Sequence, residues 1–309
     1  MYSHNLLKRF VKDYSLPIQL VREPYFSYYI DLYDKVYDSK NHFDRLKFTL
    51  EQFGNDEEKF FQYCKEIMDA AIQAVKDTPE FQAFINDRLD KYVVTNPVQS
   101  SKTVYHPDYD DCCFLSIDLK KANYYSLKFY HPNIVLNTTT FDEFISRFTD
   151  LDYIRQSKYI RQVIFGNLSP KKQQKIQKYV VHLLAALVLK HFDADRLRTT
   201  TFDEIVVELS SPQEFIGHHT FQEDVRNFAE KHGIELNMSV FRLKQLKPFS
   251  YFVKEYVIPN GKTEFKAVNI YHMPQVYKHY FHLPLHEYDL MFYHEGSIAK
   301  YIEPLAFEA

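Results

Sequence analysis

Acidic residues stand at the ends of two short apolar segments in this sequence of 309 residues. CCFLSID (112–118) is an apolar run that closes on Asp118, as a buried strand would. RLRTTTFDEIVVELSS (196–211) has β-branched residues on both sides of Asp203 and Glu204, which predicts a β-hairpin with these two acids at its tip. An acid at a strand end often only faces solvent, and Asp118 taken alone fits that simpler role.

The order of the predicted elements decides whether these acids meet. From 112 to 246 the pattern predicts a strand, helices, the hairpin, an amphipathic helix over 220–233 that stops at Gly233, and a strand over 234–246. This is the βαββαβ order of an α+β, ferredoxin-like split βαβ arrangement. Its two central strands would place Asp118 beside the hairpin tip.

Three helices are predicted between the first strand and the hairpin. They cover ANYYSLKFY (122–130), residues 140–165 and residues 169–192. Thr140 and Glu143 have the spacing of a capping box at the start of the second helix. Pro170 suits the first position of the third helix, because that position needs no backbone N–H.

A basic segment without any acid spans the second and third of these helices. Its basic residues are Arg155, Lys158, Arg161, Lys171, Lys172, Lys175 and Lys178. The whole chain carries a formal net charge of −3, so nucleic-acid binding would depend on a local patch of this kind. A solvated helix face is the usual role of a basic run. Its position between the two sets of acids favours binding of phosphates instead.

The acids and the basic segment together indicate phosphoryl-transfer chemistry. Two neighbouring carboxylates repel each other unless a cation lies between them. Two Mg²⁺ or Mn²⁺ ions held by Asp118 and Asp203 would suit an in-line displacement at phosphorus. With 6 glycines the sequence has neither a GxGxxG nor a GxxxxGK[ST] phosphate loop, so nucleotide binding through such loops is excluded.

Three segments resemble motifs of template-directed polymerases. SIDLKKANYYSLK (116–128) is similar to their first catalytic motif, most closely to its reverse-transcriptase form, in which an alanine lies four residues after the aspartate. FDEIVVEL (202–209) resembles the third motif of family A DNA polymerases, with Phe202 in place of the usual histidine. SKYIRQVIFG (157–166) resembles the family A fingers helix, although Ser169 stands where a later tyrosine is usual.

The resemblance implies a role for each matching residue. Asp118 and Asp203 would hold the divalent cations, and Glu204 would assist them or face the primer end. On the fingers helix, Lys158, Arg161 and Phe165 share one face by their spacing of three and four residues. The two basic residues would neutralise a nucleoside triphosphate, Phe165 would stack on its base, and Lys171, Lys172, Lys175 and Lys178 would contact the nucleic-acid backbone.

One further position bears on the sugar of the nucleotide. Five residues after the first aspartate, the polymerases that the sequence resembles place a bulky side chain that excludes the ribose 2′-hydroxyl. Here that position holds Asn123, which is short and can hydrogen-bond a hydroxyl. Ribonucleotides are therefore expected to be accepted, unless the neighbouring Tyr124 acts as the block.

The rest of the chain flanks this core. We expect a mostly helical N-terminal region (1–103), ending in the polar linker NPVQSSKT (96–103), and a palm- and fingers-like core (104–248). A C-terminal region (249–309) would contain a hairpin, turning at Asn260 and Gly261, and helices that act as a thumb or a cap.

The sequence also predicts where the protein works. It begins without an apolar signal core, and its longest apolar run is too short to span a bilayer, so no membrane partner is expected. Three cysteines without a CxxC pair favour a reducing, cytoplasmic compartment. The abundance of Lys, Asn, Tyr and Phe would suit a virus, a phage or a mobile element, and hence an infected cell.

These observations predict a metal-dependent nucleotidyltransferase of the polymerase kind that serves DNA replication. Its partners would be nucleoside triphosphates, a nucleic-acid primer or template, and other proteins of a larger complex. Three alternatives remain open. The βαββαβ order is also that of the RNA-recognition fold, so the protein could be a non-catalytic nucleic-acid-binding module. It could also be a degenerate polymerase kept as a scaffold, or a metal-dependent nuclease that uses the same acids.

Overall fold

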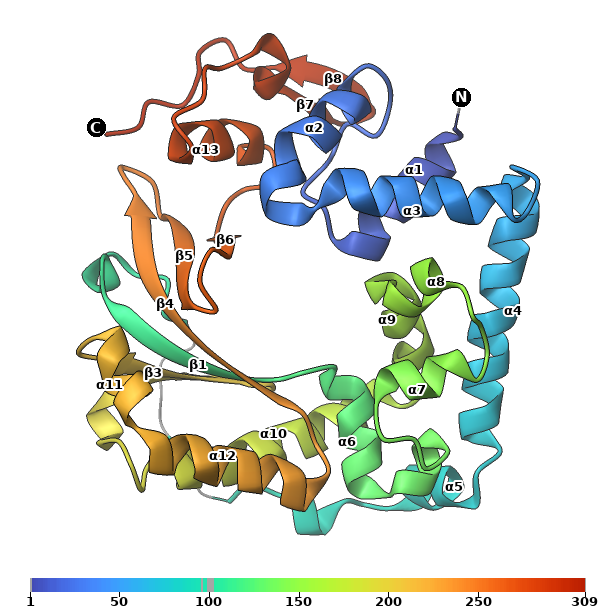
Figure 1. Cartoon of the computed structure of the whole chain (residues 1–309), viewed down its shortest axis with the longest axis vertical. Coiled ribbons are helices and arrows are strands. Elements are labelled where there is room, and N and C mark those ends of the chain that lie inside the picture. Colours follow the sequence, from blue (N-terminus) through green and yellow to red (C-terminus); the bar gives the residue numbers. More distant parts are fainter. Residues whose placement is uncertain (1, 96, 99–102, 309) are drawn as a thin grey trace.

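The computed structural model describes residues 2–95, 97–98 and 103–308 (Figure 1). Within these residues the protein is an α+β fold with 13 α-helices, a six-stranded antiparallel sheet and a small two-stranded sheet. Most of the predicted linker at 96–103 lies outside the described residues. No helix in the described part of the chain is long and apolar enough to cross a membrane.

The large sheet has the strand order β2-β3-β1-β4-β5-β6. Its strands are β1 (Cys113–Leu119), β2 (Leu197–Thr200), β3 (Glu204–Leu209), β4 (Leu236–Leu246), β5 (Tyr251–Ile258) and β6 (Thr263–Lys266). Helices connect β1 to β2 and β3 to β4, so the predicted βαββαβ order of the first four strands is confirmed. The predicted hairpin β5–β6 is also present, and Gly261 in its turn has φ of 90°.

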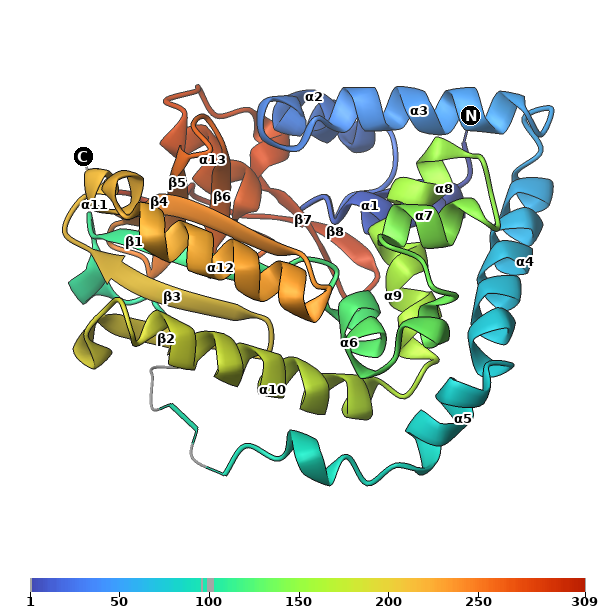
Figure 2. The same cartoon turned by 60° about the horizontal axis from the view of Figure 1, so that its bottom comes forward.

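Two helices cover one face of this sheet, α10 (Pro170–Val188) and α12 (His219–His232) (Figure 2). Leu115 and Ile117 of β1 share a hydrophobic core with Leu184 of α10 and Val225 of α12. Since side chains alternate along a strand, Ser116 and Asp118 must point to the other face. We call that side, opposite α10 and α12, the front face.

The predicted helix over 140–165 is three shorter helices, which corrects the sequence-based prediction. They are α7 (Phe141–Ser146), α8 (Asp152–Gln156) and α9 (Lys158–Gly166). Thr140 does cap α7, accepting a hydrogen bond from the Glu143 N–H at 3.1 Å. The break before α9 occurs at Ser157, whose hydroxyl caps α9 and donates to the buried Asp13 of α1 (His4–Tyr14). These side-chain bonds compete with a continuous helix.

The remaining helices complete a ring of elements around the centre of the molecule (Figure 1). They are α2 (Tyr25–Tyr37), α3 (Ser39–Glu51), α4 (Glu57–Lys76), α5 (Pro79–Asn86), α6 (Ala122–Tyr130), α11 (Pro212–Gly217) and α13 (Met273–Tyr280). Near the C-terminus, β7 (Met291–His294) pairs with β8 (Ser297–Lys300). The Tyr28 hydroxyl of α2 donates to the Asp289 carboxylate at 2.7 Å, which joins the N-terminal helices to the C-terminal region.

The largest hydrophobic core contains residues from all three predicted regions. Phe60 of α4, Ile164 of α9 and Tyr277 of α13 belong to one buried cluster. The boundaries at 103 and 248 therefore stay a prediction. The same core holds α1 and α9 against the rest of the protein.

Candidate functional site

The structure brings the three predicted acids to one end of the sheet. Asp118 in β1 lies directly opposite Glu204 in β3. Side chains paired in this way lie on the same face, with Cβ atoms about 5 Å apart. Asp203 stands at the hairpin tip, where its carbonyl oxygen accepts a hydrogen bond from the Leu119 N–H at 2.7 Å. Asp118 and Glu204 thus share the front face, and the charge of Asp203 acts on Asp118 from the neighbouring tip. The predicted proximity of the three acids is present, and their catalytic roles stay predictions.

Asp118 has the least compensated charge of the three. No hydrogen bond or ion pair to its carboxylate is found among the described residues. Burial, together with the negative charges of Asp203 and Glu204, raises the pKa of Asp118 to about 6. A cation placed beside this carboxylate would lower that pKa again.

One cation that the sequence analysis missed already lies in this cluster. Lys254 of β5 is 3% exposed, and its Nζ lies 3.2 Å from Glu204 Oε1. The same oxygen accepts a hydrogen bond from the Ser116 hydroxyl at 2.7 Å. Burial lowers the pKa of Lys254, and the Glu204 charge opposes that shift. In SYFVKEYV the alternation of Lys254 with the buried Phe252 was the signal that this lysine points inward.

The donor set suits a divalent cation that arrives with phosphates. The Glu204 carboxylate already binds Lys254 and Ser116. Asp118 and Asp203 are the remaining carboxylates of the cluster that can bind a metal ion. No group of three or more His, Cys, Asp or Glu side chains among the described residues is placed to hold a metal ion. Mg²⁺ is usually bound through one or two carboxylates plus substrate phosphates, so these two residues fit it without a closed protein cage.

Two basic residues lie beyond the end of β1. The Lys121 ammonium and the Arg161 guanidinium lie 5.2 Å and 5.6 Å from the centre of the Phe141 ring. Lys121 also pairs with Asp142 at 2.9 Å. Burial lowers the pKa of Arg161, and Asp142 opposes that shift. Phe141 therefore brings α9 next to the turn that follows Asp118.

Phe165 and Tyr124 do not occupy the places that the sequence predicted. Both side chains are 0% exposed, and their ring centres lie 6.1 Å apart inside the core. The Tyr124 hydroxyl is further bonded to Thr138. Neither ring has a free face, so the predicted stacking of Phe165 on a base and the possible block by Tyr124 are wrong. Lys158, at the start of the same helix, is exposed.

Lys172 and Lys175 also have structural roles. Lys172 Nζ donates to the backbone carbonyl oxygens of Phe84, Ile85 and Asp87 at 3.0, 2.6 and 2.5 Å. Lys175 Nζ donates to the carbonyl oxygen of Arg88 at 2.9 Å. These ammonium groups bind carbonyl oxygens at the C-terminal end of α5, and their positive charge is favourable at that end of the helix dipole. The predicted nucleic-acid contact of these two lysines is therefore corrected, whereas Lys171 and Lys178 are exposed.

Lys172→Met is expected to lower the free energy of unfolding by about 2 kcal/mol, because three carbonyl groups lose a charged donor. Lys171→Met, one residue away and exposed, should leave it unchanged. Urea denaturation of both variants checks this expectation. Equal stability of the two variants would contradict the structural role of Lys172.

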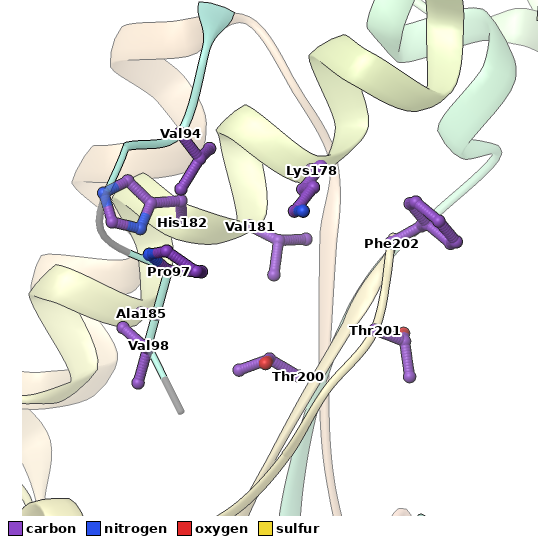
Figure 3. A pocket seen from close by; sticks show the side chains of 10 residues that line it. All are labelled: Val94, Pro97, Val98, Lys178, Val181, His182, Ala185, Thr200, Thr201 and Phe202. Atoms are coloured by element: carbon purple, nitrogen blue, oxygen red, sulfur yellow. The ribbon is translucent and has the colours of Figure 1, made fainter. Parts of the chain in front are cut away.

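The back of the hairpin borders a cavity of about 430 Å³ (Figure 3). Val181 and Ala185 of α10 form one wall, and Thr201 and Phe202 of the hairpin form another. Phe202, which stands in place of the usual histidine of the polymerase motif that the sequence resembles, is 53% exposed. Asp203 is not part of this lining, so the cavity lies behind the acids and not among them.

No family model, curated protein or solved structure matches the chain. The function must therefore be inferred from the fold and the site. Together they define a class of site, namely an acidic cluster on the front face of a βαββαβ sheet, with one internal lysine and basic residues beyond β1.

Proposed function

We propose that the protein is a metal-dependent nucleotidyltransferase of the polymerase kind, which adds nucleotides to the 3′ end of a nucleic acid. One observation carries the proposal. Asp118 lies opposite Glu204, beside the hairpin tip with Asp203, on the face of the sheet opposite α10 and α12. This is the layout expected of a polymerase palm, and it supports the resemblance of the two motifs that carry these acids.

The side chains would divide the work as follows. Asp118 and Asp203 would hold Mg²⁺ or Mn²⁺, which when bound neutralises charge on the transferring phosphoryl group. Arg161 and Lys158 of α9, with Lys121, would bind the triphosphate. A 3′-hydroxyl attacks the α-phosphate and pyrophosphate leaves, and positioning with charge neutralisation supplies most of the acceleration.

The main alternative is a binding module of the RNA-recognition kind. Such a module stacks bases on aromatic side chains of its central strands. The front-face aromatics of β1 and β4, Phe114 and Phe241, are both 0% exposed. The end of β1 carries the half-buried Asp118 instead. This distribution favours metal-dependent chemistry over base stacking on the sheet.

The proposal is tested by supplying labelled nucleotides, ribo and deoxy separately, with Mg²⁺ or Mn²⁺ and with primed, unprimed or no nucleic acid. Longer products with release of pyrophosphate are expected. Shorter products would identify a nuclease. Binding without any change in length would leave a binding module or a scaffold.

Asn123→Phe is expected to lower the incorporation of ribonucleotides relative to deoxyribonucleotides by about 100-fold. Gln177 of α10 donates to Asn123 Oδ1 at 2.8 Å, and the proposal assigns the Asn123 amide N–H to the sugar hydroxyl. A phenylalanine removes that donor and fills the space beside the 2′ position. Competing incorporation of the two nucleotides measures the ratio, and the deoxyribonucleotide rate is the internal control. An unchanged ratio would exclude Asn123 from sugar selection.

A further inference from the structure

A pocket of about 650 Å³ lies between the N-terminal helix α1, helix α9 and strand β6. These three elements face the inside of the ring in Figure 1. The described lining includes Lys12, Tyr159, Gln162, Phe265 and Lys266, and it includes no carboxylate. A protein with net charge −3 thus has a pocket that combines cations with aromatic rings.

Tyr159 lines this pocket together with Tyr37 and Phe265. The Arg9 guanidinium lies 4.4 Å and the Lys12 ammonium 5.7 Å from the centre of its ring. Arg9 is held by Asp13 at 2.9 Å, which fixes it beside the ring. Lys12 is exposed and has no carboxylate partner among the described residues. Its charge is therefore available to an anion that enters the pocket.

Strand β6 connects this pocket to the acidic cluster. Lys266 lines the pocket and pairs with Glu264 at 2.9 Å. Glu264 lies directly opposite Lys254, whose ammonium binds Glu204. The charge of Glu264 also reaches Asp118, since it contributes to the raised pKa of that residue. Strand β6 thus contributes residues both to the pocket and to the surroundings of the acidic cluster.

We propose that this pocket binds a single-stranded segment of nucleic acid, with one base stacked on Tyr159 and backbone phosphates beside Lys12 and Lys266. A cationic groove with aromatic rings is the usual arrangement in single-strand binding proteins. The role of this strand as a template or primer rests on the proposed function. The binding of the strand to the pocket is independent of that function, so it is measured without metal. The basic segment of α10 is thereby replaced as the main candidate for strand binding.

The test uses fluorescein-labelled dT20 and rU20, with anisotropy measured in EDTA at several KCl concentrations. Lys12→Gln should weaken binding and lower the salt slope by about 0.7, the value of one phosphate contact to a single strand. Tyr159→Leu should weaken binding by about 5- to 150-fold with an unchanged slope, because stacking is worth 1–3 kcal/mol per base. Tyr159→Phe should bind as the wild type does.

Lys65→Gln is the matched control, since Lys65 is exposed on α4 and does not line the pocket. The inference is overturned if the wild type does not bind at low salt, or if Lys12→Gln and Tyr159→Leu both bind like this control. It is also overturned if heparin displaces the strand while Tyr159→Leu binds like the wild type, which would indicate a surface for any polyanion. Strand binding without nucleotide transfer would support the pocket and refute the proposed function. Tighter binding of dT20 or rU20 identifies the natural strand.

Discussion

Replacing Asp118 with asparagine is expected to abolish nucleotide transfer and, in the same protein, to stabilise the fold at neutral pH. Transfer should fall by roughly 10³- to 10⁴-fold, as for other essential carboxylates, because an amide is a poor ligand for a divalent cation. The free energy of unfolding should rise by about 1–3 kcal/mol, since each pKa unit corresponds to about 1.4 kcal/mol. The pKa of Asp118 is raised from 3.8 to about 6.

The stabilisation has a defined dependence on pH. Because the folded protein binds the Asp118 proton more tightly than the unfolded chain, the contribution of the protonated acid is complete below about pH 4. It is lost as the pH rises through about 6. The difference between Asp118→Asn and the wild type should therefore grow from pH 4 to pH 7 and then stay constant. Urea denaturation at pH 4.5 and 7.5 measures it.

Asp195→Asn is the control for both effects, because Asp195 is an exposed carboxylate just before β2. It should change neither transfer nor stability. A variant at Asp118 that is less stable than the wild type at pH 7.5, or a difference that is the same at both pH values, would contradict the assigned electrostatics.

Lys254→Met is expected to be the most destabilising substitution in the site, by about 3 kcal/mol. The change leaves the Glu204 carboxylate without its cation, directly opposite Asp118. Removing one partner of a buried ion pair costs about 3–5 kcal/mol. We expect the lower part of that range, because a quarter of the Glu204 side chain is exposed. Urea denaturation measures the loss.

A second substitution separates the charge from the packing of Lys254. The double variant Lys254→Met with Glu204→Gln should recover most of the lost stability, since no unpaired charge remains. Lys244→Met is the matched control, because Lys244 is an exposed lysine of the neighbouring strand β4. If the double variant is no more stable than Lys254→Met alone, the lysine contributes packing and not charge balance.

Local patterns were sufficient for the elements that carry the acids. The apolar run before Asp118, the β-branched residues around Asp203 and the alternation in β4 all predicted strands that are present. Gly233 ends α12 with φ of 60°, where a residue with a Cβ would be strained. Each of these signals depends on residues close together in the sequence.

The incorrect predictions concern which face of a helix is buried and which residues, distant in the sequence, a side chain contacts. The spacing of Lys158, Arg161 and Phe165 showed that they share a side of a helix, but not whether that side meets solvent or the core. In the structure α9 is a separate helix that begins after Ser157, and its Phe165 lies in the core. No local pattern could reveal that Lys172 meets the end of α5, since the bond spans 88 residues.

For Lys254, the sequence indicated that the side chain is buried but not which acid it binds. Its place among inward residues of β5 indicated burial, and a buried lysine needs an anion. Which acid it meets depends on the long strand β4, which pairs with both β1 and β5. The partner could therefore be identified only in the folded chain.

The most direct test of the central claim is the initial rate at which α-labelled nucleotide enters a nucleic-acid 3′ end with Mg²⁺. The wild type, Asp118→Asn and Asp195→Asn are measured side by side at equal concentrations of folded protein. We predict incorporation by the wild type and by Asp195→Asn, and none above background by Asp118→Asn. Equal incorporation by all three proteins, or none by the wild type with either Mg²⁺ or Mn²⁺, would contradict the assignment of a nucleotidyl-transfer site to the front face.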